Sequence, residues 1–138
     1  MAFMTWNDNE FSVNIKLFDT HHKKLFDLIN RLHDAMKQGK ARDVLAQILS
    51  ELIDYTVYHF KAEEELFQKH GYPEYAQQKK EHKELTKTAL ELKAKFDKDQ
   101  IRTVLTMETM KFLKDWLNNH ICETDKKYTK FLNSKGVV

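Results

Sequence analysis

Four long segments of this chain repeat apolar residues every three or four positions, which is the spacing of one face of an α-helix. The segments span about 19–38, 42–70, 73–96 and 101–132. Only three Gly and one Pro occur among the 138 residues, so the breaks between the segments are short. An all-β sandwich needs a turn every ~8–12 residues and is therefore excluded. The pattern predicts an all-α fold, an antiparallel up-down-up-down four-helix bundle.

The residues before the first helical segment lack this periodicity. We expect 1–17 to form an extended N-terminal arm along a bundle that occupies 18–133, within a single domain spanning 1–138. A hydrophobic content of 41% excludes a disordered chain. Four apolar side chains are expected to attach the arm to the bundle, namely Trp6, Phe11, Ile15 and Leu17.

Charge and cysteine content exclude several classes of protein. Lys plus Arg number 23 and Asp plus Glu 21, with the two signs interleaved, so we expect no nucleic-acid partner. No run approaches the ~18 apolar residues of a membrane span, and the first residues do not resemble a signal peptide. The single cysteine, Cys122, cannot form an internal disulfide. These features predict a cytoplasmic protein without a membrane partner.

Polar residues interrupt the apolar stripes of all four segments. Glu63 follows His59 by four residues, so the two side chains share one helix face. Each buried polar group without a partner costs roughly 1–3 kcal/mol, and four imidazoles on one bundle axis are hard to satisfy with protein groups alone. The positions therefore predict a metal cluster. The polar residues on the stripes are His22, His59, Gln78, His82 and His120.

The remaining histidines have a simpler explanation. Any single histidine on a stripe is more often a hydrogen-bonded core residue than a metal ligand, whereas one on each of four helices is unlikely by accident. The histidines beside the stripes do not share in that pattern. His21, His33 and His70 lie beside the stripes, and we expect them at the surface or rim of the bundle. We also expect the two carboxylates that directly follow Glu63 to be solvated.

The types of ligand restrict the metal and the chemistry. Imidazole and carboxylate without thiolate suit iron, zinc or manganese. The chain has no His-Glu-x-x-His motif, so a zinc protease is unsupported. No histidine has a Glu three residues before it, which excludes the ferritin-like di-iron pattern.

The motifs that contain these residues resemble those of the hemerythrin family, specifically its single-domain bacterial members. The resemblance covers the length of the chain. The matching elements are Trp6, Asp19-x-x-His22, His59-Phe-x-x-Glu63-Glu64, Gly71-Tyr-Pro-Glu-Tyr75, Glu81-His82 and Trp116-Leu-x-x-His120-Ile-x-x-x-Asp125.

This resemblance implies a non-haem diiron centre, two Fe ions with an oxo or hydroxo bridge, that binds O2 reversibly for carriage, storage or delivery. It implies that His22 and His59 hold the iron open to O2, and that Glu63 and Asp125 bridge the pair. The second iron would be held by His82 and His120. We expect a binding protein rather than an enzyme, with O2 as its partner, and a monomer with at most weak self-association.

The spacing of His120 and Asp125 allows both to reach one centre only if the helix is locally distorted or the Asp125 side chain stretches across. Five residues correspond to about 140° around an ideal α-helix, so the two side chains would not share a face. A π-type widening of the helix would bring residues i and i+5 together. Asp125 is nominated by the resemblance and not by periodicity.

Gln78 departs from the family pattern, which usually has His-x-x-x-His on the third helix. Either the Gln78 carbonyl oxygen ligates the second iron, more weakly than an imidazole, or a water takes its place. We expect two irons still to bind, with the second one weaker or open to other ligands. The oxygenated form should also oxidise faster to the ferric state.

Three alternatives remain open at this point. The first is an O2 or redox sensor, or an iron-binding module, without stable O2 carriage. The second is a diiron enzyme that reduces peroxide or NO. The third alternative is a bundle that contains no metal.

Overall fold

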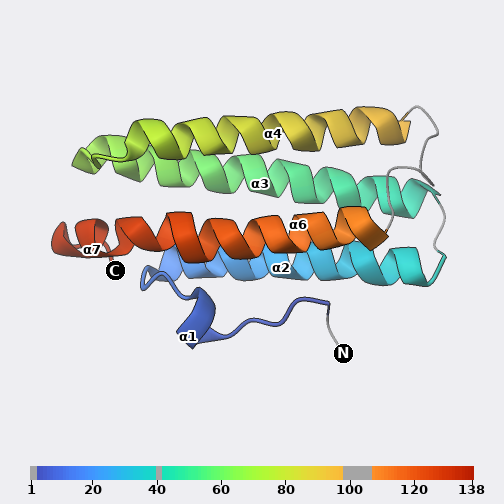
Figure 1. The fold of residues 1–138 in the computed structure, drawn as a ribbon, viewed down its shortest axis with the longest axis horizontal. Coiled ribbons are helices and arrows are strands. Elements are labelled where there is room, and N and C mark those ends of the chain that lie inside the picture. The colour runs from blue at the N-terminus through green and yellow to red at the C-terminus, as the bar shows by residue number, and fades with distance from the viewer. Residues whose placement is uncertain (1–2, 40–41, 98–106) are drawn as a thin grey trace.

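The computed structural model describes residues 3–39, 42–97 and 107–138, and this part of the chain contains helices and no strand. Figure 1 shows four long rods side by side, and successive rods run in opposite directions. The fourth rod is formed by three consecutive helical segments. The predicted all-α four-helix bundle is confirmed. The elements are α1 (Asp8–Phe11), α2 (Lys16–Lys37), α3 (Arg42–His70), α4 (Tyr75–Asp97), α6 (Met107–Asn119), the π-helix η1 (His120–Asp125) and α7 (Lys126–Ser134).

The ends of the rods differ by a few residues from those expected. Helix α2 begins at Lys16, three residues earlier than predicted, and α4 begins at Tyr75, just after Pro73. Helix α3 ends where Gly71 adopts a positive φ of 67° and the Tyr72 N–H donates to the Phe67 carbonyl. This is the usual glycine termination of a helix. The expected start of the last helix near 101, with Leu105, lies outside the described residues.

The first residues form an arm that is only partly extended. Helix α1 interrupts it, and Figure 1 shows the arm running along one side of the bundle. Phe11 and Ile15 are buried and Trp6 is half-buried against Phe26, as predicted. Leu17 is 50% exposed, so its predicted anchoring role is wrong. The physical reason is that α2 already includes Leu17, on a face that points away from the core.

Hydrogen bonds tie this arm to the first and last rods. The carboxylate of Asp19 on α2 accepts from the Val13 N–H at 2.8 Å and from the Ser12 hydroxyl at 2.6 Å. The Thr129 hydroxyl of α7 donates to the Val13 carbonyl at 2.7 Å. The arm therefore connects α2 with α7 at one end of the bundle. Cys122, half-buried, lies 3.6 Å from the Glu10 carbonyl oxygen of the arm.

The predicted widening of the last helix is confirmed. Residues His120–Asp125 form a π-helix, and the Lys126 N–H donates to the Ile121 carbonyl five residues earlier. The widened turn brings both ends of this segment to one side of the rod, where His120 Nε2 lies 3.1 Å from Asp125 Oδ1. On an ideal α-helix the two side chains would be about 140° apart, and the π-helix removes this separation.

The apolar stripes form one continuous core along the bundle axis. Most of the apolar residues expected on the stripes of α2 and α3 are buried, among them Phe18, Leu32 and Leu52. The helical period of the third and fourth segments also predicts stripe residues at Leu92, Phe96, Thr109 and Phe112, which lie outside the described side chains. Within the described ranges, no helix is long and apolar enough to cross a bilayer.

Two leucines of α2 test this assignment of the core. Leu28 is 1% exposed and Leu17 is 50% exposed. We expect Leu28→Ala to lower the free energy of unfolding by about 2–5 kcal/mol, because it removes buried methyl groups and leaves a cavity. Leu17→Ala, the same change on the same helix, should alter it by less than about 0.5 kcal/mol. Denaturant unfolding of both metal-free variants measures the difference, and equal losses would contradict the assignment.

Candidate metal centre

Each rod of the bundle contributes one buried histidine to the same central region. His22 lies on α2, His59 on α3, His82 on α4, and His120 at the start of η1. All four are buried, with exposed fractions of 5% or less. His22 Nε2 and His59 Nε2 are 3.0 Å apart. The prediction that these four side chains are buried within the bundle is therefore confirmed.

Glu63 lies between two of these imidazoles and is completely buried. Its Oε1 atom is 3.3 Å from His59 Nε2, one helical turn earlier on α3. The same oxygen is 3.3 Å from His82 Nε2 on α4. One carboxylate therefore contacts the second and third rods at once.

Asp125 has the equivalent position between the other two imidazoles. Its Oδ2 atom is 3.1 Å from His22 Nε2 on α2. Its Oδ1 atom is 3.1 Å from His120 Nε2, which the π-helix brings to the same side. Asp125 is also completely buried. Through these two contacts it joins the first and fourth rods, as Glu63 joins the second and third.

The ligand atoms divide into two groups that share both carboxylates. In each group the candidate ligand atoms lie within 4.8 Å of one another, and both groups contain Glu63 and Asp125. We call the six residues the central cluster. One group adds His22 and His59, and the other adds His82 and His120.

Several atoms of the central cluster have no hydrogen-bond partner among the described residues, although they lie close to one another. Besides His22 Nδ1, these atoms are both carboxylate oxygens of Glu63, His82 Nε2, His120 Nε2 and Asp125 Oδ2. Each such atom costs roughly 1–3 kcal/mol, and a cation placed among them would satisfy them together. The donors are imidazole nitrogens and carboxylate oxygens, so the residues present fit iron, zinc or manganese.

The electrostatics keep both carboxylates ionised, as a metal ligand must be. Burial alone would raise the pKa of Glu63, but the facing His59 and His82 outweigh it and hold the pKa well below its usual range. The pKa of Asp125 is lowered as well, because His120 and His22 outweigh burial and the nearby Glu63. The same pairing with Asp125 overcomes burial and raises the pKa of His120 to about 9.

Gln78 is buried at the edge of the central cluster. Its amide Nε2 donates a hydrogen bond of 2.7 Å to Asp125 Oδ1. The residue thus reaches the region that the sequence predicts, one turn before His82 on α4. Through this bond it supports the carboxylate that joins the first and fourth rods.

Aromatic rings cover two imidazoles of the central cluster. Phe60 stacks on His82 with ring centroids 3.9 Å apart, and Trp116 stacks on His120 at 4.7 Å. Phe60 and Trp116 also line an apolar cavity of about 50 Å³ inside the bundle. Such a cavity has few polar partners to offer a water molecule.

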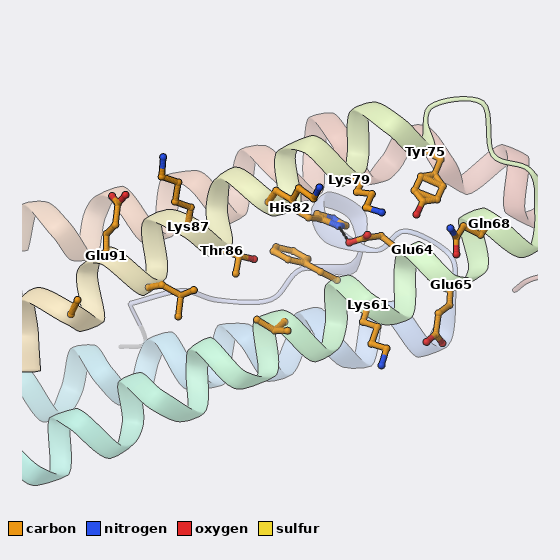
Figure 2. Close-up of a pocket in the computed structure, with 15 residues that line it drawn as sticks. Lys61, Glu64, Glu65, Gln68, Tyr75, Lys79, His82, Thr86, Lys87 and Glu91 are labelled. Carbon is orange, nitrogen blue, oxygen red and sulfur yellow. Dashed lines mark hydrogen bonds and ion pairs between the residues drawn. The ribbon is translucent and has the colours of Figure 1, made fainter.

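Glu64 departs from the prediction that it is solvated. Its side chain is only 22% exposed, and its Oε2 atom lies 3.0 Å from His82 Nδ1. Figure 2 shows the pair at the wall of a groove between α3 and α4. The carboxylate thus lies behind His82, on the side of the ring opposite to the central cluster. The next residue, Glu65, is exposed as predicted.

Two histidines predicted at the surface or rim are buried. His21 packs against α3, and its Nδ1 atom is 2.8 Å from His59 Nδ1. His33 stacks on Phe3 of the arm with centroids 4.0 Å apart. The stripe rule missed them because it follows a single face, whereas α2 also packs against residues outside that face. His70 is partly exposed, as expected for the rim.

Comparisons with known proteins agree with this geometry. The family model described as Hemerythrin HHE cation binding domain matches residues 13–132. A bacteriohemerythrin of Methylococcus capsulatus is 40% identical over 134 residues, which are 97% of this chain and 100% of that protein. A hemerythrin-like protein of Naegleria gruberi is 38% identical over 88% of this chain and 87% of that protein.

A solved structure extends the likeness to three dimensions. The crystal structure of a wild-type hemerythrin aligns with a TM-score of 0.88 and 40% sequence identity, covering 94% of this chain and 97% of that one. The match to the family model and the identity along almost the full length show that this chain belongs to the hemerythrin family.

Proposed function

We propose that this chain binds O2 reversibly at a pair of non-haem iron ions held by the central cluster. The observation that carries the proposal is the division of the ligand atoms into two groups that share Glu63 and Asp125. A single metal would not need two carboxylates, each of which lies between imidazoles of different groups. Membership of the hemerythrin family supports iron as the metal and O2 as the partner.

The chain's residues would divide between the two ions as the resemblance to the family implies. His22 and His59 belong to one ion, His82 and His120 to the other, and the two carboxylates belong to both. When bound, the ferrous ions supply the electrons that reversible O2 binding requires. The imidazoles must be neutral to ligate. Burial lowers the pKa of His59 in that direction, whereas Asp125 raises the pKa of His120, so metal binding there would release a proton.

The surrounding side chains would protect this chemistry from water. Phe60 and Trp116 cover two of the imidazoles, and Phe18 lies edge-on to His59 at 5.9 Å. The apolar cavity beside these rings suits a small apolar gas better than water. An apolar shell restricts the access of protons and water to a metal site.

Gln78 makes the site of the second ion, at His82 and His120, different from that of family members with a histidine at this position. Its amide nitrogen is engaged with Asp125, which supports a role as a hydrogen-bond donor to a shared carboxylate. The second ion then has one protein ligand fewer than it would have with a histidine in place of Gln78. We propose that this ion is held more weakly and has a position open to exogenous ligands.

Carriage of O2, rather than its reduction, is the function we propose, in a cytoplasmic and mostly monomeric protein. Reduction of peroxide or NO at the more open ion is the second candidate, and the engagement of Gln78 with Asp125 is the observation that favours it. The two differ in stoichiometry, because a carrier binds one O2 per centre and an enzyme turns over repeatedly with a reductant.

The first test is reversible binding. The ferrous protein should gain near-ultraviolet and visible charge-transfer absorption on exposure to air and lose it again under vacuum. Repeated consumption of O2, peroxide or NO in the presence of a reductant would favour the enzyme instead. A protein with no metal-dependent absorption would contradict both functions.

A second test removes one shared carboxylate. We expect Glu63→Gln to reduce the iron content from about two ions per chain to less than one, because an amide supplies no negative charge to either ion. Glu65→Gln makes the same change at an exposed position of the same helix and should leave the iron content unchanged. Iron is measured per chain after anaerobic loading, and equal contents in the two variants would refute the role of Glu63.

A third test restores the usual histidine. Gln78→His should strengthen binding of the second ion and slow oxidation of the oxygenated form, because an imidazole is a better iron ligand than an amide. Gln77→His adds the same side chain at the exposed neighbouring position and serves as the control. Oxidation is followed by the decay of the absorption band in air. An unchanged rate in Gln78→His would count against the weakened site of the second ion.

A further inference from the structure

A fifth imidazole touches the central cluster from behind. His21 Nδ1 lies 2.8 Å from His59 Nδ1, and the two ring planes cross at 87°. The opposite nitrogen of His59, Nε2, faces the cluster and lies 3.3 Å from Glu63 Oε1. His59 is therefore held between a carboxylate on the cluster side and a second histidine on the outer side.

The chemistry of imidazole fixes the direction of this hydrogen bond. A neutral imidazole has one N–H donor and one acceptor nitrogen. If His59 Nε2 ligates a metal, it has no proton, so the proton of that ring is on Nδ1 and must be donated outward. The nitrogen that receives it is Nδ1 of His21, whose own proton is then on Nε2.

We propose that His21 is a positioning residue for His59, accepting its Nδ1 hydrogen and so fixing the tautomer and orientation of that ring for metal binding. The inference rests on the proposed metal centre but concerns a residue outside the ligand set. Partners of this kind normally lie behind metal-bound histidines, and they are carboxylates, carbonyls or waters. A second neutral imidazole can serve because one of its nitrogens is an acceptor.

The surroundings of His21 hold it in this position. It is 3% exposed, and the rings of Tyr55 and Tyr58 lie 5.8 and 5.3 Å from its centroid. Phe18 packs on it at 6.2 Å.

A similar arrangement on α4 strengthens the interpretation. His82 has the Glu64 carboxylate 3.0 Å from its Nδ1 atom, on the outer side of the ring. His21 has the same relation to His59 that Glu64 has to His82. Two of the four metal-facing histidines thus have an acceptor behind them, supplied by a residue next in sequence to a member of the central cluster.

The direct test is the position of the protons. Zn²⁺ is redox-inert and binds imidazole, so the Zn²⁺-loaded protein with ¹⁵N-labelled histidine is suited to NMR. Correlating ring nitrogens with carbon-bound ring protons identifies each tautomer. We expect the proton of His59 on Nδ1 and the proton of His21 on Nε2. A proton on Nδ1 of His21 would overturn the proposal.

Variants test the consequence for metal affinity. We expect His21→Leu to weaken Zn²⁺ binding by about 10–100-fold, the usual effect of losing such a partner. His21→Gln supplies an amide oxygen as acceptor and should retain most of the affinity. Competition with a chromophoric chelator measures both. If His21→Gln loses as much as His21→Leu, packing rather than the hydrogen bond is responsible and the proposal fails.

His33→Leu is the matched control, because it removes another buried histidine of α2 that stacks on the arm rather than on the central cluster. Its Zn²⁺ affinity should equal that of the unchanged protein. If His21→Leu also binds Zn²⁺ as tightly as the unchanged protein, the role of His21 is overturned but the metal centre is not. An unchanged protein that bound neither Zn²⁺ nor Fe²⁺ would overturn the metal centre and this inference together.

Discussion

Two buried carboxylates, each held between imidazoles from different rods, are the constraint on which the rest of this structure depends. Glu63 contacts His59 and His82. Asp125 contacts His22 and His120. A buried charge is tolerated only when it is paired or bound to a metal. The four rods must therefore keep their relative positions, because displacing any one leaves a charge without its partner.

The bundle supplies that rigidity with ordinary packing. Large apolar side chains surround the polar centre, and several of them stack directly on the imidazoles, as Phe60 does on His82. Helices position ligands more accurately than loops, and packed rings restrict the rotation of the side chains that they touch. The same residues that form the core thus also hold the ligands in place and keep water away from them.

The sequence predicts the rods and the four histidines for one reason, which is that the helical period identifies the side chains on the buried face. It could not identify Asp125, because that position shares a face with His120 only after the backbone widens into a π-helix. The resemblance to a family supplied this residue, and the structure gave the physical explanation.

The misses have a common cause in the width of the buried faces. His21 and Glu64 each directly adjoin a stripe residue, so a rule based on one face assigns them to solvent. In fact His21 is buried and Glu64 half-buried, and each lies behind a ring of the central cluster. A pair of adjacent polar residues at a stripe position is the signal that could have indicated them. Helix ends were less predictable, because the start of α2 is fixed by contacts of Asp19 with the arm, which lacks the helical period.

The arm also determines how the bundle can open. Val13 receives a hydrogen bond from Thr129 through its carbonyl and donates one to Asp19 through its N–H. Asp19 lies one turn before His22, and Thr129 lies one turn after Asp125, so this short strap joins the two helices at the level of the ligands. Separating the first and fourth rods there requires the strap to detach as well. Opening of the central cluster to solvent at this end is thereby coupled to the release of the N-terminal segment.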